Sequence, residues 1–458
     1  MPRKEINPDH EQQQYTKMTG TPIPKLVFLL SLPSIVSMII TSIYNTADAY
    51  FVSQISTAAS GAVGIVLPMM ALTQGIGFTY AVGAGTQVAQ LLGARKVEEA
   101  NQYGSSAMAI AIISGILITL FGQWQLDNLL RLFGATETIL PYAKDYARWI
   151  LFGAPISISQ FVLNLQLRFQ GKNNLSMVGL MIGGILNIIL DPIFIFTFGL
   201  GIKGAAMATI LSQMVSWAIL YWMVRNKSIL EISLRNISSR IQTYATIVGT
   251  GISSFLRQGL ASIAIILLNN AARPFGDEAI AAIVIVGRVS MIMFSVIIGI
   301  GQGFQPIAGY NYGAKMYSRV REAWRVTYIA MTVLVSITGA IIFINSPSII
   351  RAFRSDAMVV SIGSTMLRYI SLSLIAQPML TSTNMLLQTT GHIKASSFLA
   401  ATRQGLFFIP LLLVLPPLFG IRGIQISQPI ADVLSAIAAI PFLIYFMKNL
   451  PKVDGAEK

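Results

Sequence analysis

Residues 183–192 read Gly-Gly-Ile-Leu-Asn-Ile-Ile-Leu-Asp-Pro, and this stretch decides the fold. It lies in an apolar run, residues 177–198, whose only polar side chains are Asn187, Asp191 and Thr197. A run of this length predicts a membrane-spanning helix, on which Asn187 and Asp191, four residues apart, share one face. A carboxylate at that depth costs about 2.5 kcal/mol or more, and Pro192 should kink the helix and release a carbonyl. A carboxylate, an amide and a released carbonyl at one place could bind a proton or a small cation. Alternatively, they could form a structural hydrogen bond between two helices.

The composition extends the membrane prediction to the whole chain. Of its 458 residues, 54% are apolar and only 11% are charged, whereas roughly a quarter of the residues of a soluble domain are charged. We therefore expect an all-α polytopic membrane protein with about 12 spans. The net charge of +14 is typical of basic cytoplasmic loops and does not call for a nucleic-acid partner. There is no cysteine, and the two histidines are His10 and His392, so no metal centre is expected.

A polar linker at residues 225–242 divides the chain into two groups of six spans. We expect a polar N-terminal tail (1–23), a first lobe (24–224), the linker on the cytoplasmic side, a second lobe (243–447) and a C-terminal tail (448–458). The expected spans lie near residues 24–51, 57–83, 102–123, 139–167, 175–198, 201–224, 243–272, 278–305, 322–345, 359–388, 395–416 and 422–447.

The two lobes match each other at a constant offset of 220 residues. Six spans per lobe, an even number, give both lobes the same orientation, so a pseudo-twofold axis along the membrane normal is expected. A duplication with only structural meaning is the alternative, but duplicated bundles are typical of alternating-access transporters. The polar and glycine matches include Arg131 with Arg351, Asn164 with Asn384, Gly171 with Gly391 and Ser176 with Ser396.

Lysine and arginine are unevenly distributed over the connections. The even-numbered connections and both tails hold most of them, for example Arg95, Lys172, Arg240 and Lys394, and the odd-numbered connections hold few. This bias predicts that both termini are cytoplasmic.

Three acids fall well inside spans: Asp48, Asp191 and Asp432. The repeat partners of Asp48 and Asp191 are Leu268 and Leu411, so these two acids have no counterpart in the second lobe. A purely structural role would more naturally occur in both lobes, and we therefore expect ion chemistry in the first. If the two carboxyl groups face each other, the pair favours a bound proton. The same oxygens, with Asn187 and a hydroxyl group, could hold Na+.

Charged residues also occur within spans of the second lobe. Asp432 could attract cationic substrates or form a hydrogen bond to a neighbouring helix. We expect Arg257, Arg288 and Arg403 to pair with Asp432 or with helix carbonyls more readily than to bind substrate. The candidates for lining a substrate cavity are Asp432, Arg288 and Asn164.

Along nearly its whole length the chain resembles the multidrug and toxic compound extrusion (MATE) family. The resemblance rests on the Asp48 segment, on Leu-Leu-Gly-Ala-Arg at 91–95 and on Asn-Ile-Ile-Leu-Asp-Pro at 187–192. It rests also on Gln-Pro-Ile-Ala-Gly-Tyr-Asn-Tyr-Gly-Ala at 305–314, which is typical of bacterial drug-efflux members. The family has twelve helices in two six-helix lobes, in agreement with the repeat.

The resemblance implies an ion site in the first lobe. The family places an Asp on the first helix, an Asn and an Asp four residues apart on the fifth, and a Thr on the sixth, here Asp48, Asn187, Asp191 and Thr209. Pro33 corresponds to a proline implicated in bending the first helix. Some members also carry a carboxylate on the seventh helix, but residues 263–270 contain none.

We therefore expect a multidrug efflux antiporter of the bacterial inner membrane. It would exchange amphipathic and cationic drugs for H+ or Na+ as a monomer among membrane lipids. It would need no cofactor beyond the coupling ion, and it would be no enzyme, since the chain lacks a His or Cys nucleophile set. The alternative is a flippase for lipid-linked precursors, whose pyrophosphate favours a cationic cavity. Arg257, Arg288 and Arg403 leave that alternative open, whereas Asp48 and Asp191 argue against it.

Overall fold

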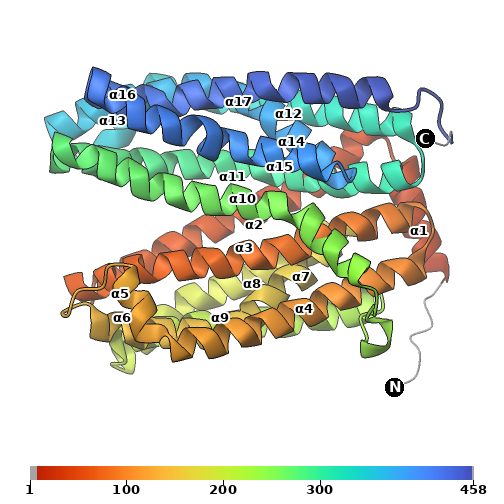
Figure 1. Ribbon diagram of the computed structural model, residues 1–458, viewed down its shortest axis with the longest axis horizontal. Helices are drawn as coiled ribbons and strands as arrows, with labels where there is room; N and C mark the ends of the chain where they lie inside the picture. The colour runs from red at the N-terminus through yellow and green to blue at the C-terminus, as the bar shows by residue number, and fades with distance from the viewer. Residues whose placement is uncertain (1–7, 456–458) are drawn as a thin grey trace. The chain divides into compact units, whose positions relative to one another are not determined.

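The structure is a computed structural model that describes residues 8–455, and within this range it is helical without any strand (Figure 1). Eleven helices of the described part are long and apolar enough to cross a membrane, and a pair bent by 48° makes a twelfth span. The expected all-α membrane fold is thereby confirmed. Because this pair, α6 and α7, breaks just before a proline at residue 155, the bend has a local backbone cause.

The helices keep the order that the apolar runs predict. Several extend further than expected, because polar and glycine-rich turns beyond the apolar run continue the same helix. The bounds are α1 (Pro8–Gly20), α2 (Ile23–Ser53), α3 (Thr57–Gly93), α4 (Val97–Trp124), α5 (Leu126–Leu132), α6 (Leu140–Phe152), α7 (Ala154–Phe169), α8 (Asn173–Pro192), α9 (Gly201–Lys227), α10 (Ile241–Ala272), α11 (Asp277–Gly313), α12 (Tyr317–Phe353), α13 (Ala357–Ser373), α14 (Gln377–Thr389), α15 (Ile393–Ala401), α16 (Ile409–Phe419) and α17 (Ile421–Asn449).

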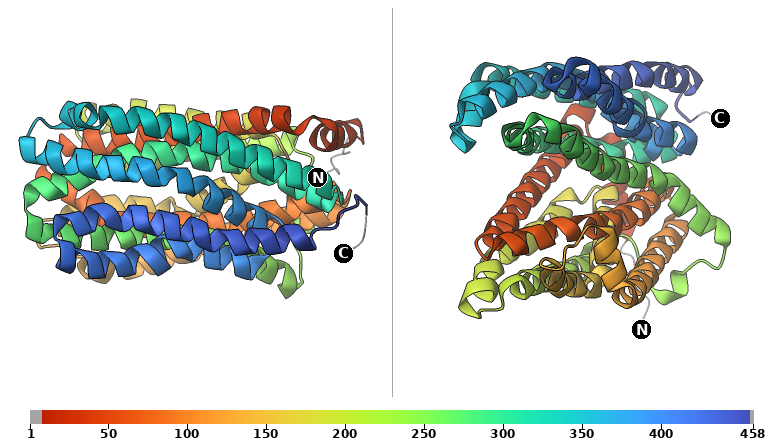
Figure 2. Two further views of the ribbon diagram at one scale, coloured as in Figure 1. Left: turned by 90° about the horizontal axis from the view of Figure 1, so that it is seen from above. Right: turned by 60° about the vertical axis from the view of Figure 1, so that its left-hand side comes forward.

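By their contacts the described residues form two compact units. Unit 1 consists of residues 8–20 and Val36–Phe255, and unit 2 of Thr21–Ile35 and residues 256–455. The chain therefore changes unit inside α2 and again inside α10, and not at the loops that bound the lobes expected at 24–224 and 243–447. The helices on which each half of α2 and α10 packs decide to which unit that half belongs. The sequence shows only where the loops lie. Within each unit the helices run lengthwise beside one another (Figure 2).

The repeat recurs in the backbone of each unit. Helices α3 and α11 both have 37 residues. Each is followed by a residue in the left-handed region, Arg95 with φ 59° and Lys315 with φ 56°, which are 220 positions apart. No other non-glycine residue of the described part has positive φ.

A side-chain contact is duplicated as well. Asn164 on α7 donates a hydrogen bond to the carbonyl oxygen of Ser176, at 2.9 Å. At the offset of 220, Asn384 on α14 donates to the carbonyl oxygen of Ser396, at 2.6 Å. The sequence matches therefore correspond to equivalent contacts in the two units.

The linker between the halves of the sequence is docked onto unit 1. Ile229 and Leu230 are buried. The side-chain oxygen of Gln170 accepts hydrogen bonds from the hydroxyl of Ser228 and the backbone N–H of Ile229, both at 2.9 Å. The backbone N–H of Glu231 donates to Asn101 on α4 at 2.8 Å. Polar side chains of unit 1 thus satisfy backbone N–H groups of the linker that an unattached loop would leave to water.

Part of the expected N-terminal tail is a helix. In α1, Gln14 donates a hydrogen bond to the backbone oxygen of Gln170 at 2.7 Å, and Met18 is fully buried. The guanidinium of Arg95 lies 4.2 Å from the centre of the Tyr15 ring, within the range of a cation–π contact. The described residues of α1 therefore pack on unit 1, although their composition is polar.

Two glycines let α10 approach α3 at backbone contact within unit 1. A Cβ atom on Gly83 would lie 1.9 Å from the carbonyl oxygen of Ile247, and one on Gly251 would lie 1.9 Å from that of Thr79. No side chain fits there, so small residues are required for the close crossing. This crossing explains why the first half of α10 belongs to unit 1.

Candidate ion site

The fifth expected span carries the polar pair from which the sequence analysis began. The amide of Asn187 donates a hydrogen bond to Asp191 Oδ1 at 3.0 Å. Both side chains are buried, and Asp191 is 0% exposed. This contact confirms that the two residues share one face of α8. Thr209, on α9, lies 3.5 Å from the Asn187 amide nitrogen, so the hydroxyl expected from the resemblance lies beside the pair.

Beyond Asp191 the helix changes its winding. Helix α8 ends at Pro192, and residues Ile193–Thr197 follow as a π-helical turn, in which the N–H of Phe198 reaches the carbonyl of Ile193 at 2.9 Å. At the place of the expected kink the structure shows a change from α-helical to π-helical winding, of a kind often found at functional sites. It follows directly from the missing backbone donor of proline.

Helix α2 approaches α8 through a glycine. A Cβ atom on Gly184 would lie 3.1 Å from the Tyr44 ring and 3.4 Å from Ile40, so a larger side chain at 184 would push α2 away. Asp48 lies one helical turn beyond Tyr44 and therefore on the same face of α2. Its side chain is half-buried, and the contact of Tyr44 with Gly184 brings this face of α2 against α8, the helix that carries Asp191.

Three buried oxygen atoms at this place have no hydrogen-bond partner among the described residues: Asp48 Oδ1, Asp191 Oδ2 and the hydroxyl of Tyr146. Tyr146 lies on α6 and is fully buried, in a core cluster with Val52 of α2 and Ala205 of α9. Buried polar atoms without a partner are uncommon and call for an explanation such as a bound ion or water. All three atoms are oxygens, which suit a proton or a hard cation.

Neither carboxylate pairs with a fixed base. In residues 8–455, the ion pairs of unit 1 lie elsewhere and at least partly exposed, as between Lys144 and Asp127. No lysine or arginine of the described chain forms an ion pair with Asp48 or Asp191. The two carboxyl groups therefore have no basic side chain as an ion-pair partner within the described residues.

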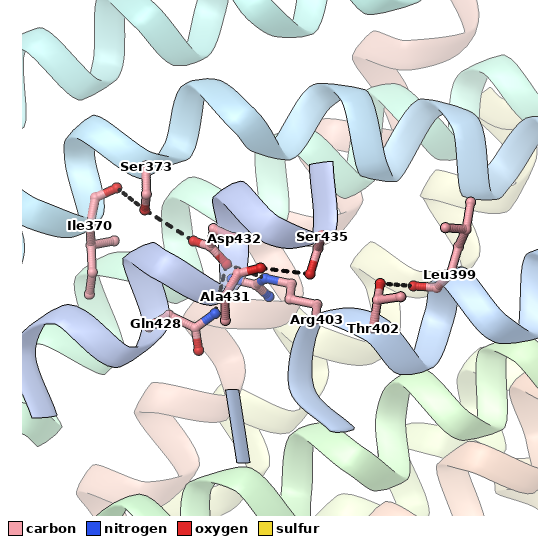
Figure 3. A network of polar contacts seen from close by, with 9 residues as sticks. All are labelled: Ile370, Ser373, Leu399, Thr402, Arg403, Gln428, Ala431, Asp432 and Ser435. Atoms are coloured by element: carbon pink, nitrogen blue, oxygen red, sulfur yellow. Dashed lines mark hydrogen bonds and ion pairs between the residues drawn. The ribbon is translucent and has the colours of Figure 1, made fainter. Parts of the chain in front are cut away.

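The third acid, Asp432, has a different environment in unit 2. Arg403 Nε lies 2.9 Å from Asp432 Oδ1, and the amide of Gln428 donates to the same oxygen at 2.7 Å. The hydroxyl of Ser373 donates to Oδ2 at 3.1 Å. Figure 3 shows these three side chains directed at the carboxylate from neighbouring helical segments. The contacts favour the structural alternative for Asp432, because its charge is compensated inside the unit.

The remaining candidates differ in exposure. Asn164 is buried and bonded to Ser176, and Arg168 donates to its side-chain oxygen at 3.3 Å. Arg288, on α11, is exposed and forms no ion pair or hydrogen bond within the part of the chain that the structure describes. Pro33 is buried inside α2, which continues through it as one helix.

Tyr146 is the member of the site that sequence reasoning missed. It stands in Pro-Tyr-Ala-Lys-Asp-Tyr at 141–146, where charged neighbours make the segment resemble a loop or a membrane surface. The one available signal was the spacing of buried residues 143, 146 and 147 on one face of α6, which marks Tyr146 as inward-facing.

Known proteins resemble this chain along nearly its whole length. A family model described as MatE matches residues 33–193 and 253–414, one segment in each half of the repeat and well over half of the chain. The chain is 28% identical over 429 residues to the multidrug export protein MepA of Staphylococcus saprophyticus, covering 93% of this chain and 94% of that protein. It is 27% identical over 450 residues to MepA of Staphylococcus aureus, covering 98% and 99%.

Solved structures of transporters also match this chain over nearly its whole length. A structure described as the outward-facing conformation of a multidrug resistance MATE family transporter of the MOP superfamily matches with a TM-score of 0.90 at 27% identity, covering 96% of this chain and 99% of that one. A MOP superfamily transporter from Pyrococcus furiosus, described as having a binding pocket of reverse polarity, matches with a TM-score of 0.90 at 26% identity, with the same coverage.

Proposed function

Because the chain belongs to the MatE family, we propose that it is a secondary transporter that exports amphipathic and cationic organic compounds from bacteria in exchange for H+ or Na+. The names of its relatives, multidrug export proteins of staphylococci, support the substrate class. The positive-inside bias supports an orientation with both termini in the cytoplasm.

The observation that carries the proposal is the uncompensated acid pair of unit 1. Asp48 and Asp191 each leave a buried oxygen without a partner, and no fixed base neutralises them. A buried charge of this kind is costly unless something positive occupies the site. A coupling ion that enters from outside and leaves inside meets this requirement.

The mechanism is a difference in ion affinity between two conformations. Ion uptake neutralises Asp48 and Asp191 and so removes the cost of keeping them away from water. The conformation in which they are most buried is then favoured, and a compound bound to the other conformation is released. Pro33, which lacks a backbone donor inside α2, gives this helix a place to bend. An ion with equal affinity for both conformations would not shift their populations and could not drive transport.

The flippase alternative loses support in unit 2. Arg257 donates to Asn384 at 3.4 Å, and Arg403 is paired with Asp432. Of the three span arginines, only Arg403 is neutralised by a carboxylate. The remaining two charges, on Arg257 and Arg288, do not make a strongly cationic cavity for a pyrophosphate.

Transport in proteoliposomes tests the antiport directly. We expect a fluorescent cationic dye to leave vesicles faster when an H+ or a Na+ gradient is directed into the lumen that holds it. A protonophore should remove the effect of an H+ gradient, and a Na+ ionophore that of a Na+ gradient. Protein-free liposomes provide the control. A rate of dye efflux that changes with neither gradient would contradict the antiport.

Arg288 gives a prediction about substrate choice. It lies 11 residues into α11, about 16 Å from the start of the helix and thus near the middle of the bilayer. An exposed charge at that depth avoids lipid, so we propose that Arg288 faces the aqueous substrate path. Arg288→Gln should lower the apparent affinity for zwitterionic substrates with a carboxylate about tenfold, since a charge-assisted hydrogen bond contributes about 1.5–3 kcal/mol.

Purely cationic substrates should bind Arg288→Gln as well as the unaltered protein or better. The matched control is Arg354→Gln, which removes an exposed arginine of the same unit at the end of α12. Concentration-dependent transport of one zwitterionic and one monocationic dye measures both effects. An equal loss for the two dyes would place Arg288 outside the substrate path.

A further inference from the structure

Unit 2 contains a groove whose lining includes neither Asp432 nor any of the span arginines. Its volume is about 440 Å³, and it lies between the end of α14, the start of α15 and the last turns of α17. Apolar side chains make most of its wall. The lining residues are Leu387, His392, Lys394, Ala395, Pro441, Phe442, Tyr445 and Phe446.

The surface around the groove is apolar and exposed. On α17, Tyr445 is 70% exposed, and Ile440 and Ile444 are also exposed. Phe398 of α15 is exposed next to Phe442, with 5.5 Å between the ring centres. In a membrane-spanning helix an apolar exposed face contacts lipid, so the groove opens to the bilayer. The groove reaches to within four residues of the end of α17, about 6 Å along the helix, and therefore lies at the membrane boundary.

One end of the groove is basic. Lys394 is exposed and pairs with no carboxylate in residues 8–455. His392 is held beside it, with Nδ1 3.1 Å from the Thr390 hydroxyl and its ring edge against Phe446 at 5.1 Å. In the proposed orientation this end faces the cytoplasmic leaflet, whose surface is negatively charged.

We propose that this groove binds one anionic phospholipid of the cytoplasmic leaflet. The headgroup phosphate contacts Lys394, and an acyl chain lies along Pro441 and Phe442. The charge decides between occupants, because Lys394 repels the cationic compounds that the transporter exports and attracts a phosphate. An anionic lipid has an apolar chain and a negatively charged headgroup. The apolar wall of the groove matches the chain, and Lys394 and the exposed Tyr445 lie at headgroup level.

Native mass spectrometry of the full-length protein tests the proposal with phosphatidylglycerol and phosphatidylcholine of identical acyl chains. We expect one phosphatidylglycerol to bind more tightly than phosphatidylcholine. Lys394→Glu should weaken phosphatidylglycerol binding about 25-fold, about fivefold for each unit of charge. Lys394→Gln should weaken it about fivefold and serves as the milder variant. Ala395→Trp, which fills the groove, should weaken both lipids.

Lys448→Glu is the matched control, since it reverses a charge at the same end of unit 2 outside the groove lining. We expect it to change binding less than threefold. Thermal unfolding of each variant in detergent checks that the fold is retained. Equal effects of Lys394→Glu and Lys448→Glu would show only general surface attraction and overturn the proposal. Unchanged lipid binding by Ala395→Trp would overturn it too.

Two further probes distinguish the sources of the ligand chemistry. Dodecyl phosphate should compete with phosphatidylglycerol, because it carries both the phosphate and the chain, whereas inorganic phosphate alone should not. Dodecyltrimethylammonium should compete poorly, because Lys394 repels it. Strong competition by the ammonium compound, unaffected by Lys394→Glu, would mean that the groove takes exported cations and would refute the lipid assignment.

Discussion

Asp191→Asn is expected to abolish ion-driven export while leaving the fold intact. Asparagine has nearly the same shape and preserves a side-chain oxygen to accept the 3.0 Å hydrogen bond from Asn187. It cannot take up a proton or neutralise a cation, so the ion no longer distinguishes the two conformations. Dye efflux driven by an H+ or Na+ gradient should fall to the rate of protein-free liposomes, measured in the same vesicles as for the unaltered protein.

The matched control is Asp127→Asn, the same substitution on α5 of the same unit. Asp127 is exposed and paired with Lys144, so its loss should change transport less than twofold, since a surface pair contributes about 0–1 kcal/mol. Binding of the dye to both variants without a gradient separates lost coupling from lost substrate affinity. If Asp191→Asn transports at the normal rate with normal ion dependence, the acid pair is not the coupling site.

Arg403→Met is expected to destabilise the protein strongly. It leaves Asp432, which is 1% exposed, without its ion-pair partner, and only Gln428 and Ser373 remain to stabilise the carboxylate. Breaking a buried pair in this way costs about 3–5 kcal/mol. We expect the lower end of this range, because the Arg403 side chain is 22% exposed. The guanidinium also loses its position 4.7 Å from the centre of the Phe294 ring.

The double variant Arg403→Met with Asp432→Leu should recover most of that loss. Replacing both members of a buried pair by apolar residues is often neutral, since the desolvation of both charges is removed together. Apparent melting temperatures in detergent should therefore rank the double variant close to the unaltered protein and Arg403→Met well below both. Lys144→Gln provides the surface comparison, with a loss of at most about 1 kcal/mol. A double variant as unstable as Arg403→Met would mean that Asp432 is needed for reasons other than this pair.

The number and order of the spans could be predicted from the sequence because apolar runs of membrane length leave little choice. The contact between Asn187 and Asp191 could be predicted as well, because it depends only on helical spacing within one element. Thr209 came from the family resemblance, and the structure places it beside this pair. These features are local or are repeated across a family.

What could not be predicted depends on contacts between distant segments. The partner of Asp432 was one of several span arginines, and only packing selects Arg403. The neighbours of Tyr146 depend on the packing of α6 against α3 and α9, whereas the spacing within α6 shows only that Tyr146 faces inward. The passage of the chain between units inside α2 depends on where glycines such as Gly299 and Gly303 allow the backbone of α11 to approach, so hydropathy does not mark it.

The assignment of residues 21–35 to unit 2 has a consequence for biosynthesis. Ser31 donates its hydroxyl to the backbone oxygen of Ile300, 269 positions later in the chain, at 3.3 Å. At a synthesis rate of about 5–20 residues per second, roughly 13–54 s pass between the emergence of these two residues from the ribosome. During that interval the earliest membrane helix waits in the bilayer with half of its packing surface uncovered, so completion of unit 2 depends on a segment inserted before any of its other helices exist.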